Sequence, residues 1–271
     1  MKIQKKFLIF SLFIVVLFFS GCTESANEIG SASEADSIKV EKKSDGKEKI
    51  IFLHHSTGEN IWNGGLAEEL SEYSIEEQEF PKDSPYGWEN YPYDYWNIWV
   101  NNAGESEYMD EPTLEMLTQN YDVIMFKHCF PVGYIEEDTG NADIASSEKT
   151  LENYKLQYNA LKEKMLEFPN STFIVWTGAT LVESETDPSY AERMQEFVNW
   201  VKTEWDEEGD NIYIWDFYDL ETEGNLYLKD SYSQGDSHPN ESFSLMVAPY
   251  LANRIRGIIE GDGDNNNLTG K

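Results

Sequence analysis

The chain has 271 residues and a net charge of −31 at pH 7, with 51 acidic residues against 20 lysines and arginines. So acidic a surface repels phosphate backbones, which excludes nucleic acid as an expected partner and disfavours polyanionic substrates. A high-salt habitat would produce the same composition. Aromatic residues make up 14% of the chain, more than a disordered protein carries, so we expect one folded domain with a full core.

Residues 1–22 have the three parts of a secretory signal. Lysines precede an almost wholly apolar run, which is too short for an ordinary membrane-spanning helix, and Ser20 and Gly21 are small residues before Cys22. This ending resembles the lipobox of prokaryotic lipoproteins, although Phe19 stands where leucine is usual. The resemblance implies that Cys22 is lipidated and anchors an extracytoplasmic, cell-surface protein to the membrane. An uncleaved amino-terminal anchor is the alternative.

The rest of the chain divides into a linker, a domain and a tail. Residues 23–48 are polar and poor in large apolar side chains, which predicts a flexible linker before a domain over 49–260. Apolar runs predict buried strands at 50–53, 122–126, 172–177 and 211–217. Apolar residues spaced three and four apart predict helices at 62–73, 111–120, 146–168, 190–205 and 241–259. We expect residues 261–271 to be a disordered tail, after a loop over 218–237.

Alternating strands and helices predict an α/β fold, a three-layer α/β/α sandwich with a mostly parallel, flavodoxin-like central sheet. Residues 75–102 interrupt this pattern with prolines and aromatic side chains. They form either an aromatic rim over an active site, suited to sugar rings, or a loop pinned by its own aromatics. The aromatic residues are Tyr86, Trp88, Tyr91, Tyr93, Tyr95, Trp96 and Trp99.

All four histidines, His54, His55, His128 and His238, fall at the ends of predicted strands or in the loop before the last helix. Ligands of a parallel sheet bind beyond the carboxyl ends of its strands, so this clustering predicts a functional site. A serine hydroxyl becomes a nucleophile when a base takes its proton, and histidine is the usual base. Ser56 supplies the hydroxyl, and His238 can supply the base.

The segment His-His-Ser-Thr-Gly over 54–58 and the His-Pro-Asn segment over 238–240 resemble motifs of the SGNH, or GDSL-type, hydrolases. The resemblance follows the element order over about residues 49–260 and implies an α/β/α sandwich. It also implies that Ser56 is the nucleophile, that His238 is the catalytic base, and that the backbone N–H of Ser56 helps to stabilise an oxyanion. Where the family has Gly-Asp-Ser, this chain has His-His-Ser.

Three further positions depart from the family pattern. The family's orienting aspartate lies three residues before the histidine, where this chain has Gly235, so Asp236 is our candidate. A Ser–His dyad helped by a backbone carbonyl or by another acid is the alternative. The resemblance places His128 where the family has its asparagine oxyanion donor, and we assign the family's glycine donor to Gly104. His54, His55 and Gly58 are expected to support the turn, with His55 in the position of the family's aspartate.

The same residues also suggest two other chemistries, a metal site and a thiol nucleophile. The four histidines, with Asp236, are a candidate zinc or iron site. Adjacent histidines at a strand end point to opposite sides, however, so we expect no metal ion and no cofactor. Cys129, beside His128, suggests a thiol nucleophile, but a lone cysteine after a buried strand is more often packed than reactive. It is also the only cysteine besides Cys22, so no intramolecular disulfide is expected once Cys22 is lipidated.

These observations predict an extracytoplasmic serine ester hydrolase that acts on a small-molecule or glycan ester. The aromatic segment favours an O-acylated carbohydrate, such as an O-acetylated glycan, over a long-chain lipid. The alternative is a non-catalytic, surface glycan-binding module on the same fold. Gly235, at the position where the family has its acid, favours that alternative.

Overall fold

The computed structural model describes residues 46–271, so the predicted signal segment, Cys22 and all but the end of the predicted linker lie outside the described residues. Five strands form one sheet in the order β2-β1-β3-β4-β5, and all four neighbouring pairs are parallel. The strands are β1 (Lys49–His54), β2 (Ser74–Glu79), β3 (Val123–Phe126), β4 (Thr172–Trp176) and β5 (Ile212–Trp215). This order is the flavodoxin-like one that the sequence predicted.

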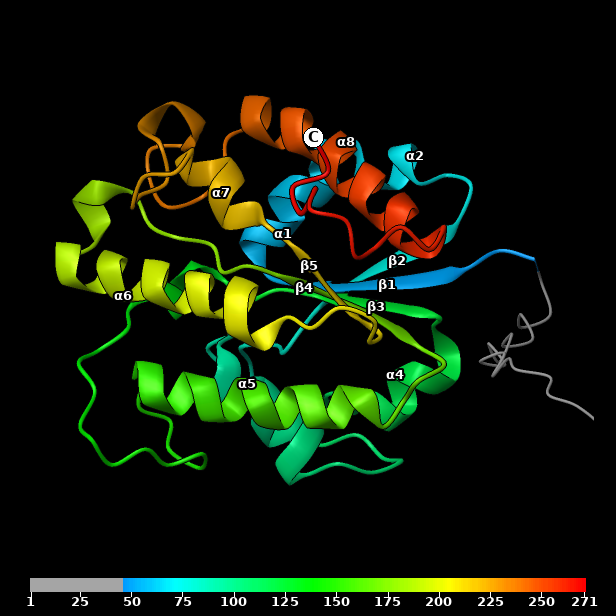
Figure 1. The fold of residues 1–271 in the computed structure, drawn as a ribbon, viewed down its shortest axis with the longest axis horizontal. Coiled ribbons are helices and arrows are strands. Elements are labelled where there is room, and N and C mark those ends of the chain that lie inside the picture. The colour runs from blue at the N-terminus through cyan, green and yellow to red at the C-terminus, as the bar shows by residue number, and fades with distance from the viewer. Residues whose placement is uncertain (1–45) are drawn as a thin grey trace, which may run out of the picture. The chain divides into compact units, whose positions relative to one another are not determined.

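Helices cover both faces of the sheet, which confirms the three-layer α/β/α sandwich (Figure 1). One face carries α1 (Ser56–Ile61), α2 (Ala67–Glu69), α7 (Phe217–Thr222) and α8 (Glu241–Ile259). The other face carries α3 (Pro92–Trp96), α4 (Leu114–Asn120), α5 (Leu151–Leu166) and α6 (Pro188–Trp200). Wider, π-helical turns continue α1, α3 and α6 at Trp62–Leu66, Asn97–Asn101 and Val201–Trp205.

The sheet separates two apolar cores because alternate strand residues point to opposite faces. In β3, Ile124 and Phe126 belong to the core under α3–α6, whereas Val123 and Met125 belong to the core under α8. All four are buried, which explains why this strand appears in the sequence as a continuous apolar run. The alternation also decides to which side the first residues beyond each strand point.

Three elements differ from the prediction. Strand β2 was missed because it is an edge strand with mostly exposed, charged side chains, so no apolar pattern marks it. The first helix starts at Ser56, directly after β1, and not at residue 62. Helix α7 begins at the last residue of the predicted strand over 211–217 and continues into the predicted loop over 218–237. The strands buried on both faces were the elements that the sequence predicted best.

The aromatic segment over 75–102 contains α3 and belongs mainly to the core. Tyr95 and Trp99 are fully buried, and the Trp99 ring packs edge-on against Phe126, with 5.1 Å between ring centroids. The Tyr95 hydroxyl donates hydrogen bonds to the carbonyl oxygens of Lys127 at 2.9 Å and Phe80 at 3.2 Å. The loop is therefore pinned by its own aromatics, and the predicted aromatic rim is wrong for these residues.

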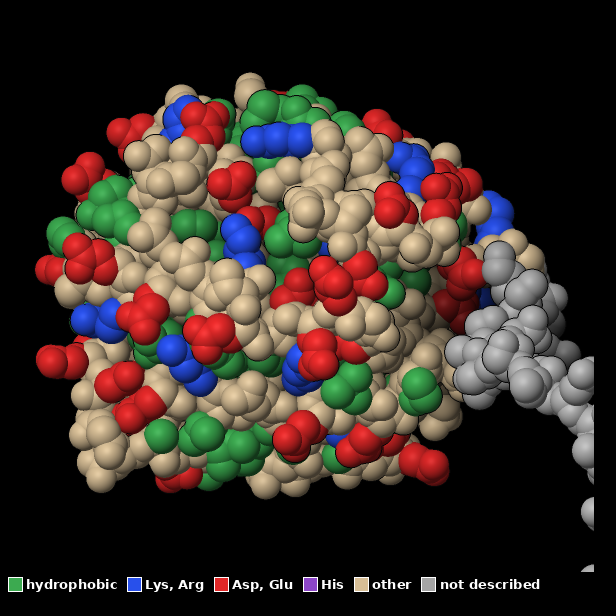
Figure 2. All heavy atoms as spheres, in the orientation of Figure 1, with side chains coloured by type: hydrophobic (Ala, Val, Ile, Leu, Met, Phe, Trp, Pro, Cys, Tyr) green, Lys and Arg blue, Asp and Glu red, His purple; other side chains and the backbone are tan. Residues whose placement is uncertain are grey.

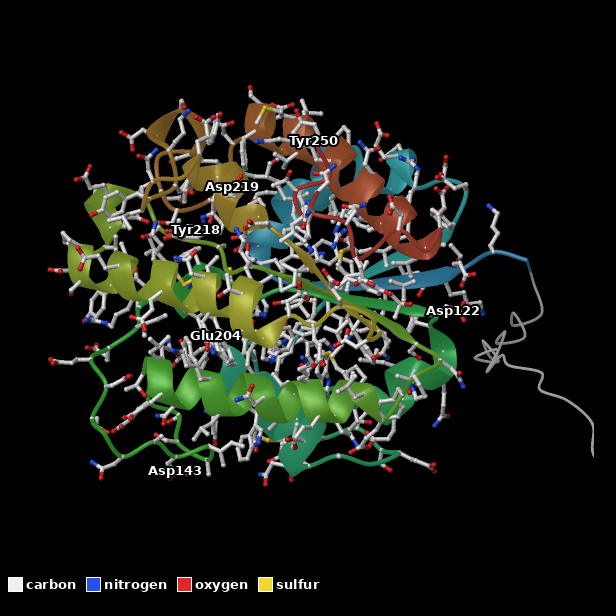
Figure 3. The ribbon with its side chains drawn as sticks, viewed as in Figure 1. Asp122, Asp143, Glu204, Tyr218, Asp219 and Tyr250 are labelled. Carbon is white, nitrogen blue, oxygen red and sulfur yellow. The ribbon has the colours of Figure 1, made fainter. Side chains whose placement is uncertain are left out.

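Residues 261–271, predicted to be a disordered tail, fold back against the domain, and the C-terminus lies beside α8 (Figure 1). The indole of Trp215 donates to the carbonyl of Thr269 at 3.0 Å, and the amide of Asp216 donates to the carbonyl of Leu268 at 2.9 Å. Gly270, at φ +73°, lies against the carbonyl of Tyr250 on α8, and Tyr250 is labelled in Figure 3. A Cβ atom at Gly270 would be only 1.9 Å from that carbonyl oxygen. The prediction failed because backbone contacts hold this polar segment.

Acidic side chains are spread over the visible face, with lysines and arginines between them (Figure 2). Among residues 46–271, no helix combines the length and the apolar character needed to cross a membrane. The lipid anchor and the extracytoplasmic location remain predictions, since the residues on which they depend are outside the described part.

Candidate active site

Ser56 is the first residue of α1, immediately beyond the carboxyl end of β1. His55 has an extended backbone, with φ −119° and ψ −165°, so the chain turns from strand to helix between these two residues. Gly58 makes this close turn possible because a Cβ atom there would lie 2.3 Å from Cβ of His54. This contact is a physical reason for the predicted supporting role of Gly58.

The structure brings Ser56, His238 and Asp236 together. Nε2 of His238 lies 2.8 Å from Oγ of Ser56, and Nδ1 lies 3.1 Å from Oδ1 of Asp236. The same Oδ1 accepts the backbone N–H of His238 at 2.9 Å. An imidazole whose Nδ1–H donates to a carboxylate presents the Nε2 lone pair to the serine hydroxyl, which is the tautomer a general base needs.

The turn before α8 places His238 and Asp236. Asn240 caps α8 by accepting the N–H of Phe243 at 2.9 Å, and the amide of Gln234 donates to the carbonyl of His238 at 2.9 Å. Gly235 has a φ of +108°, a value that glycine adopts readily. This glycine, which replaces the acid expected from the family pattern, thus shapes the turn that lets Asp236 reach the imidazole.

Asp236 is partly solvated, with 53% of its side chain exposed. Hydrogen bonds from the backbone N–H and then the imidazole of His238 hold the pKa of the Asp236 carboxyl below its usual value. The carboxylate is therefore ionised at neutral pH, but water screens its charge, so its effect on the imidazole is smaller than that of a buried acid.

Ser56 and His238 border an open pocket of about 410 Å³. Its walls combine aromatic, acidic and amide side chains, and the lining residues are His55, Ser56, Asp83, Trp88, Glu89, Asn90, Cys129, Phe130, Pro131 and His238. Trp88 is the only member of the predicted aromatic rim among these residues. The pocket has the volume of a small-molecule binding site.

The two residues expected as oxyanion donors lie elsewhere. His128 is only 1% exposed and packs against the rings of Tyr95 and Tyr158, at centroid distances of 4.6 and 5.6 Å. Neither of its ring nitrogens has a hydrogen-bond partner, and burial, with a smaller effect of Lys127, lowers its pKa to about 3. Gly104 is not part of the pocket wall, and its carbonyl accepts the hydroxyl of Thr113. Both assignments are corrected by these positions.

The backbone N–H of Ser56 is the predicted oxyanion donor that still borders the pocket. It belongs to the first turn of α1, where a helix has no internal acceptor for its amides. Asn90 lines the pocket, but its amide group is engaged elsewhere, since Nδ2 donates to Phe80 at 2.6 Å and Oδ1 accepts the amide of Cys129.

Cys129 is a pocket residue that sequence reasoning assigned to packing. Its Sγ lies 3.5 Å from Oγ of Ser56 and 3.6 Å from Oγ1 of Thr57. Burial by itself raises the pKa of the thiol. The charge of Lys127 and hydrogen bonds from Ser56 and Thr57 have the larger, opposite effect, so the net pKa lies below the usual value. The sequence does contain a signal that Cys129 faces the pocket. Consecutive side chains of an extended chain point to opposite sides, so Cys129 points away from the side on which His128 is buried.

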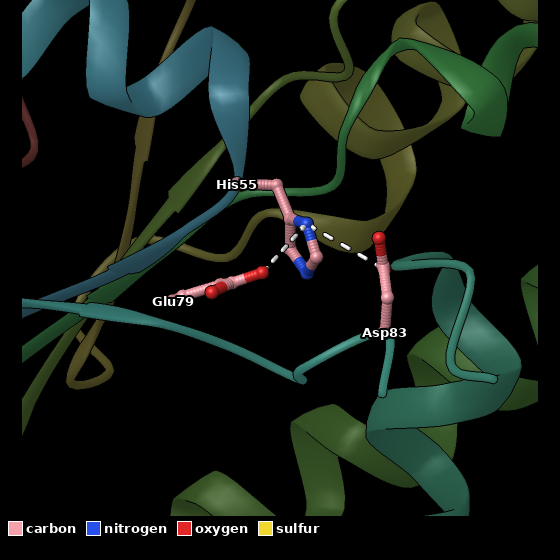
Figure 4. A group of neighbouring side chains, drawn as sticks. All are labelled: His55, Glu79 and Asp83. Carbon is pink, nitrogen blue, oxygen red and sulfur yellow. Dashed lines mark ion pairs between the residues drawn. The ribbon is translucent and has the colours of Figure 1, made fainter. Parts of the chain in front are cut away.

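His54 and His55 have separate roles. Nδ1 of His54 donates to the carbonyl of His55 at 3.0 Å, and Nε2 meets Oε2 of Glu77 at 2.9 Å, so the imidazole links β1 to β2. Burial lowers the pKa of His54 to about 4, and burial also raises the pKa of the Glu77 carboxyl. His55 instead contacts Pro81, Glu79 and Asp83 (Figure 4). The four histidines therefore do not converge on one metal ion.

No family model matches the chain, and no curated protein matches it. Among solved structures it is similar to the C-terminal catalytic domain of Streptococcus pneumoniae peptidoglycan O-acetyltransferase A with a methylsulfonyl adduct. That match has 13% identity over 80% of this chain and 95% of the other, with a TM-score of 0.43.

Two other solved structures have similar scores. The N-terminal part of a Bacteroides fragilis protein, containing a phosphatase domain complexed with Mg, matches at 12% identity over 79% of this chain and 53% of that one, with a TM-score of 0.46. A gut microbial diltiazem-metabolizing enzyme matches at 13% identity over 80% and 47%, with a TM-score of 0.45. The chain spans about half of the length of these two proteins.

Proposed function

We propose that this protein is a serine ester hydrolase with Ser56 as nucleophile, His238 as general base and Asp236 as the orienting acid. The observation that carries the proposal is the 2.8 Å approach of His238 Nε2 to Ser56 Oγ, with Asp236 at the other ring nitrogen, beside an open pocket. A serine, a histidine and an acid in hydrogen-bond sequence are the arrangement that activates a hydroxyl for acyl transfer.

In the proposed reaction, Ser56 Oγ attacks the ester carbonyl while Nε2 of His238 takes the hydroxyl proton. The backbone N–H of Ser56 donates to the oxygen of the tetrahedral intermediate. Nε2–H then gives its proton to the departing alcohol as the carbon–oxygen bond breaks, which leaves an acyl-enzyme. A water molecule attacks this acyl group with His238 again as base, and the acid is released with Ser56 regenerated. The Asp236 carboxylate stabilises the imidazolium in each half of the reaction.

We propose an acetyl or similarly short ester of a neutral carbohydrate as the substrate class. The pocket of about 410 Å³ suits a small acyl group, and Trp88, although only 8% exposed, contributes an aromatic side chain to its wall. Asp83 and Glu89 on the wall accept hydrogen bonds from hydroxyl groups and repel anionic substrates. The predicted amino-terminal lipoprotein signal agrees with a protein that acts at the cell surface, on a glycan or small-molecule ester reached from a lipid anchor.

Glycan binding without turnover is the second candidate, and one observation favours it. The expected oxyanion donors, His128 and Gly104, are not among the pocket residues, so fewer hydrogen bonds are available to a tetrahedral intermediate than in the family pattern. A binding module would use the same pocket without acylation of Ser56.

A fluorophosphonate probe separates these two functions. We expect covalent labelling at Ser56 and hydrolysis of p-nitrophenyl acetate, both lost by at least about 10³-fold in Ser56→Ala. Cys129→Ala is the matched control, because it removes the neighbouring nucleophile and leaves the serine. Unchanged hydrolysis in Ser56→Ala, or a wild-type protein inert towards the probe and a panel of acetylated sugars, would contradict the esterase proposal.

A further inference from the structure

A second cluster of chemically active side chains borders the pocket one residue before Ser56. It consists of His55, Glu79 and Asp83, and His55 and Asp83 are also pocket-lining residues (Figure 4). Glu79 is the last residue of β2, which the sequence did not predict as a strand. Parallel pairing of β1 with β2 brings this carboxylate beside the strand end that carries His55.

The imidazole of His55 is held in one orientation. Its side chain is only 11% exposed, and Nε2 donates to the carbonyl of Pro81. Because a carbonyl only accepts, the ring proton of the neutral imidazole is on Nε2, and Nδ1 carries a lone pair. Within the described residues 46–271, Nδ1 has no hydrogen-bond partner, and it faces Oε1 of Glu79 at 3.9 Å and Oδ1 of Asp83 at 3.8 Å. A backbone carbonyl that fixes a histidine tautomer in this way is the usual second partner of a metal-binding imidazole.

Two carboxylates and a lone pair that face one another repel unless a positive charge lies between them, either a proton on Nδ1 of His55 or a metal ion. Within residues 46–271, neither Glu79 nor Asp83 forms an ion pair with a lysine or arginine. The three ligand atoms all lie within 4.8 Å of one another, and the two distances from Nδ1 of His55, 3.9 and 3.8 Å, exceed hydrogen-bond length. An ion about 2.1 Å from each atom bridges such separations after small side-chain movements.

We infer that His55, Glu79 and Asp83 bind a divalent transition-metal cation, Zn²⁺ or Mn²⁺, at the wall of the pocket. One imidazole nitrogen and two carboxylates form a mixed set that suits these ions better than Ca²⁺ or Mg²⁺, which prefer oxygen ligands alone. Three protein ligands leave coordination positions for water or for a hydroxyl of a bound molecule. The site stands independently of the proposed esterase activity, since its ligands do not include Ser56 or His238.

Metal binding to the full-length protein, stripped with a chelator, tests the inference. We expect isothermal titration with ZnCl₂ and MnCl₂ to give one saturable site, in 150 mM NaCl with millimolar Mg²⁺ to suppress diffuse binding to the acidic surface. Asp83→Asn and Glu79→Gln should each weaken binding at least about tenfold, because loss of a ligand exceeds the effect of losing an outer partner. Glu89→Gln is the matched control, since it removes a pocket carboxylate outside the cluster.

His55→Gln should abolish the saturable site, and Tm measurements establish that each variant is folded. Asp83 is largely exposed, so Asp83→Asn keeps the test decisive if His55→Gln does not fold. Absence of a saturable site in the wild type, or equal affinity in Asp83→Asn and wild type, overturns the inference. Fluorophosphonate labelling of Ser56 in Asp83→Asn reports separately on the serine, so failure of the metal site and failure of the esterase are distinguishable.

Discussion

Two histidines occupy matched positions of neighbouring strands and have opposite surroundings. Leu53 of β1 pairs with Phe126 of β3, and His55 and His128 each lie two residues further along the chain. His55 borders the pocket beside Ser56, whereas His128 is sealed between Tyr95 and Tyr158. The layer that covers each strand end decides the difference, because α3 and α5 close over β3. A strand-end histidine therefore does not by itself identify a catalytic residue.

The largest expected effect comes from the histidine of the pocket. His238→Ala should lower kcat/KM for p-nitrophenyl acetate by about 10³-fold or more, because Ser56 loses its proton acceptor. Tm should change little, since the imidazole lies at the pocket wall and not in a core. His128→Leu, assayed on the same substrate, is the contrasting variant and should change kcat/KM by less than about threefold. An equal loss of kcat/KM in His238→Ala and His128→Leu would contradict the assignment of His238, and not His128, as the catalytic base.

Asp236→Asn sharpens the assignment of the orienting acid. We expect a loss of about 10²-fold in kcat, less than for a buried triad acid, because the Asp236 carboxylate is partly screened by water. KM should be unaffected if the residue acts through His238 only. Asp230→Asn, an exposed acid of the same loop, is the matched control and should retain wild-type kcat. Full activity in Asp236→Asn would favour a Ser–His dyad.

The dependence of protein stability on pH tests the burial of His128. Burial lowers the pKa of His128 to about 3, below the unfolded value of 6.5, so the folded state favours the neutral ring. The neutral His128 ring makes its full contribution to the free energy of unfolding above pH 6.5, and this contribution is lost as the pH falls towards 3. Between pH 6.5 and 4.5 the loss is about 2 kcal/mol.

Urea unfolding at the two pH values measures this contribution. His128→Leu should show a smaller loss of unfolding free energy on acidification than the wild type, whereas His238→Ala should retain the wild-type loss. The same acid sensitivity in His128→Leu and wild type would mean that His128 is not buried as a neutral ring.

The smallest expected effect concerns Cys129, the residue that points to the pocket in place of His128. Cys129→Ala should change kcat by less than about fivefold, because Ser56 and His238 keep their hydrogen bond. Cys129 borders the pocket and the pKa of its thiol is lowered, so we expect a small reagent such as methyl methanethiosulfonate to modify it. That reagent should inactivate the wild type by blocking the pocket and leave Cys129→Ala active. Inactivation of both proteins would place the reactive group elsewhere.

Much of this architecture could be predicted from the sequence. Strands β1, β3, β4 and β5 are largely buried and therefore appear as apolar runs, whereas β2 has no such pattern because its side chains face solvent. Ser56, His238 and Asp236 were predicted from motifs that lie next to recognisable strands and helices. His128 was misassigned because its environment is set by Tyr95 and Tyr158, whose contacts depend on how distant helices cross the sheet.

The cluster of His55, Glu79 and Asp83 illustrates the same limit. Its three members come from a strand end, an unpredicted edge strand and the loop after it, so their proximity depends on strand register. Asp236 was the reverse case, since the local turn at Gly235 determines its reach and no distant contact is needed. Functional residues that lie within one turn can be predicted from the sequence. A cluster whose members come from different strands can be identified only from the structure.

The folded-back C-terminal segment has a consequence for the solution behaviour of the protein. Strand β5 is one of the two outer strands of the sheet, and the carbonyl oxygens of Leu268 and Thr269 accept hydrogen bonds from the backbone of Asp216 and the indole of Trp215 at its carboxyl end. Outer strands are places where one protein molecule can pair with another and aggregate. Because residues 268 and 269 occupy the carboxyl end of β5, we expect truncation of this segment to make that outer strand more prone to self-association.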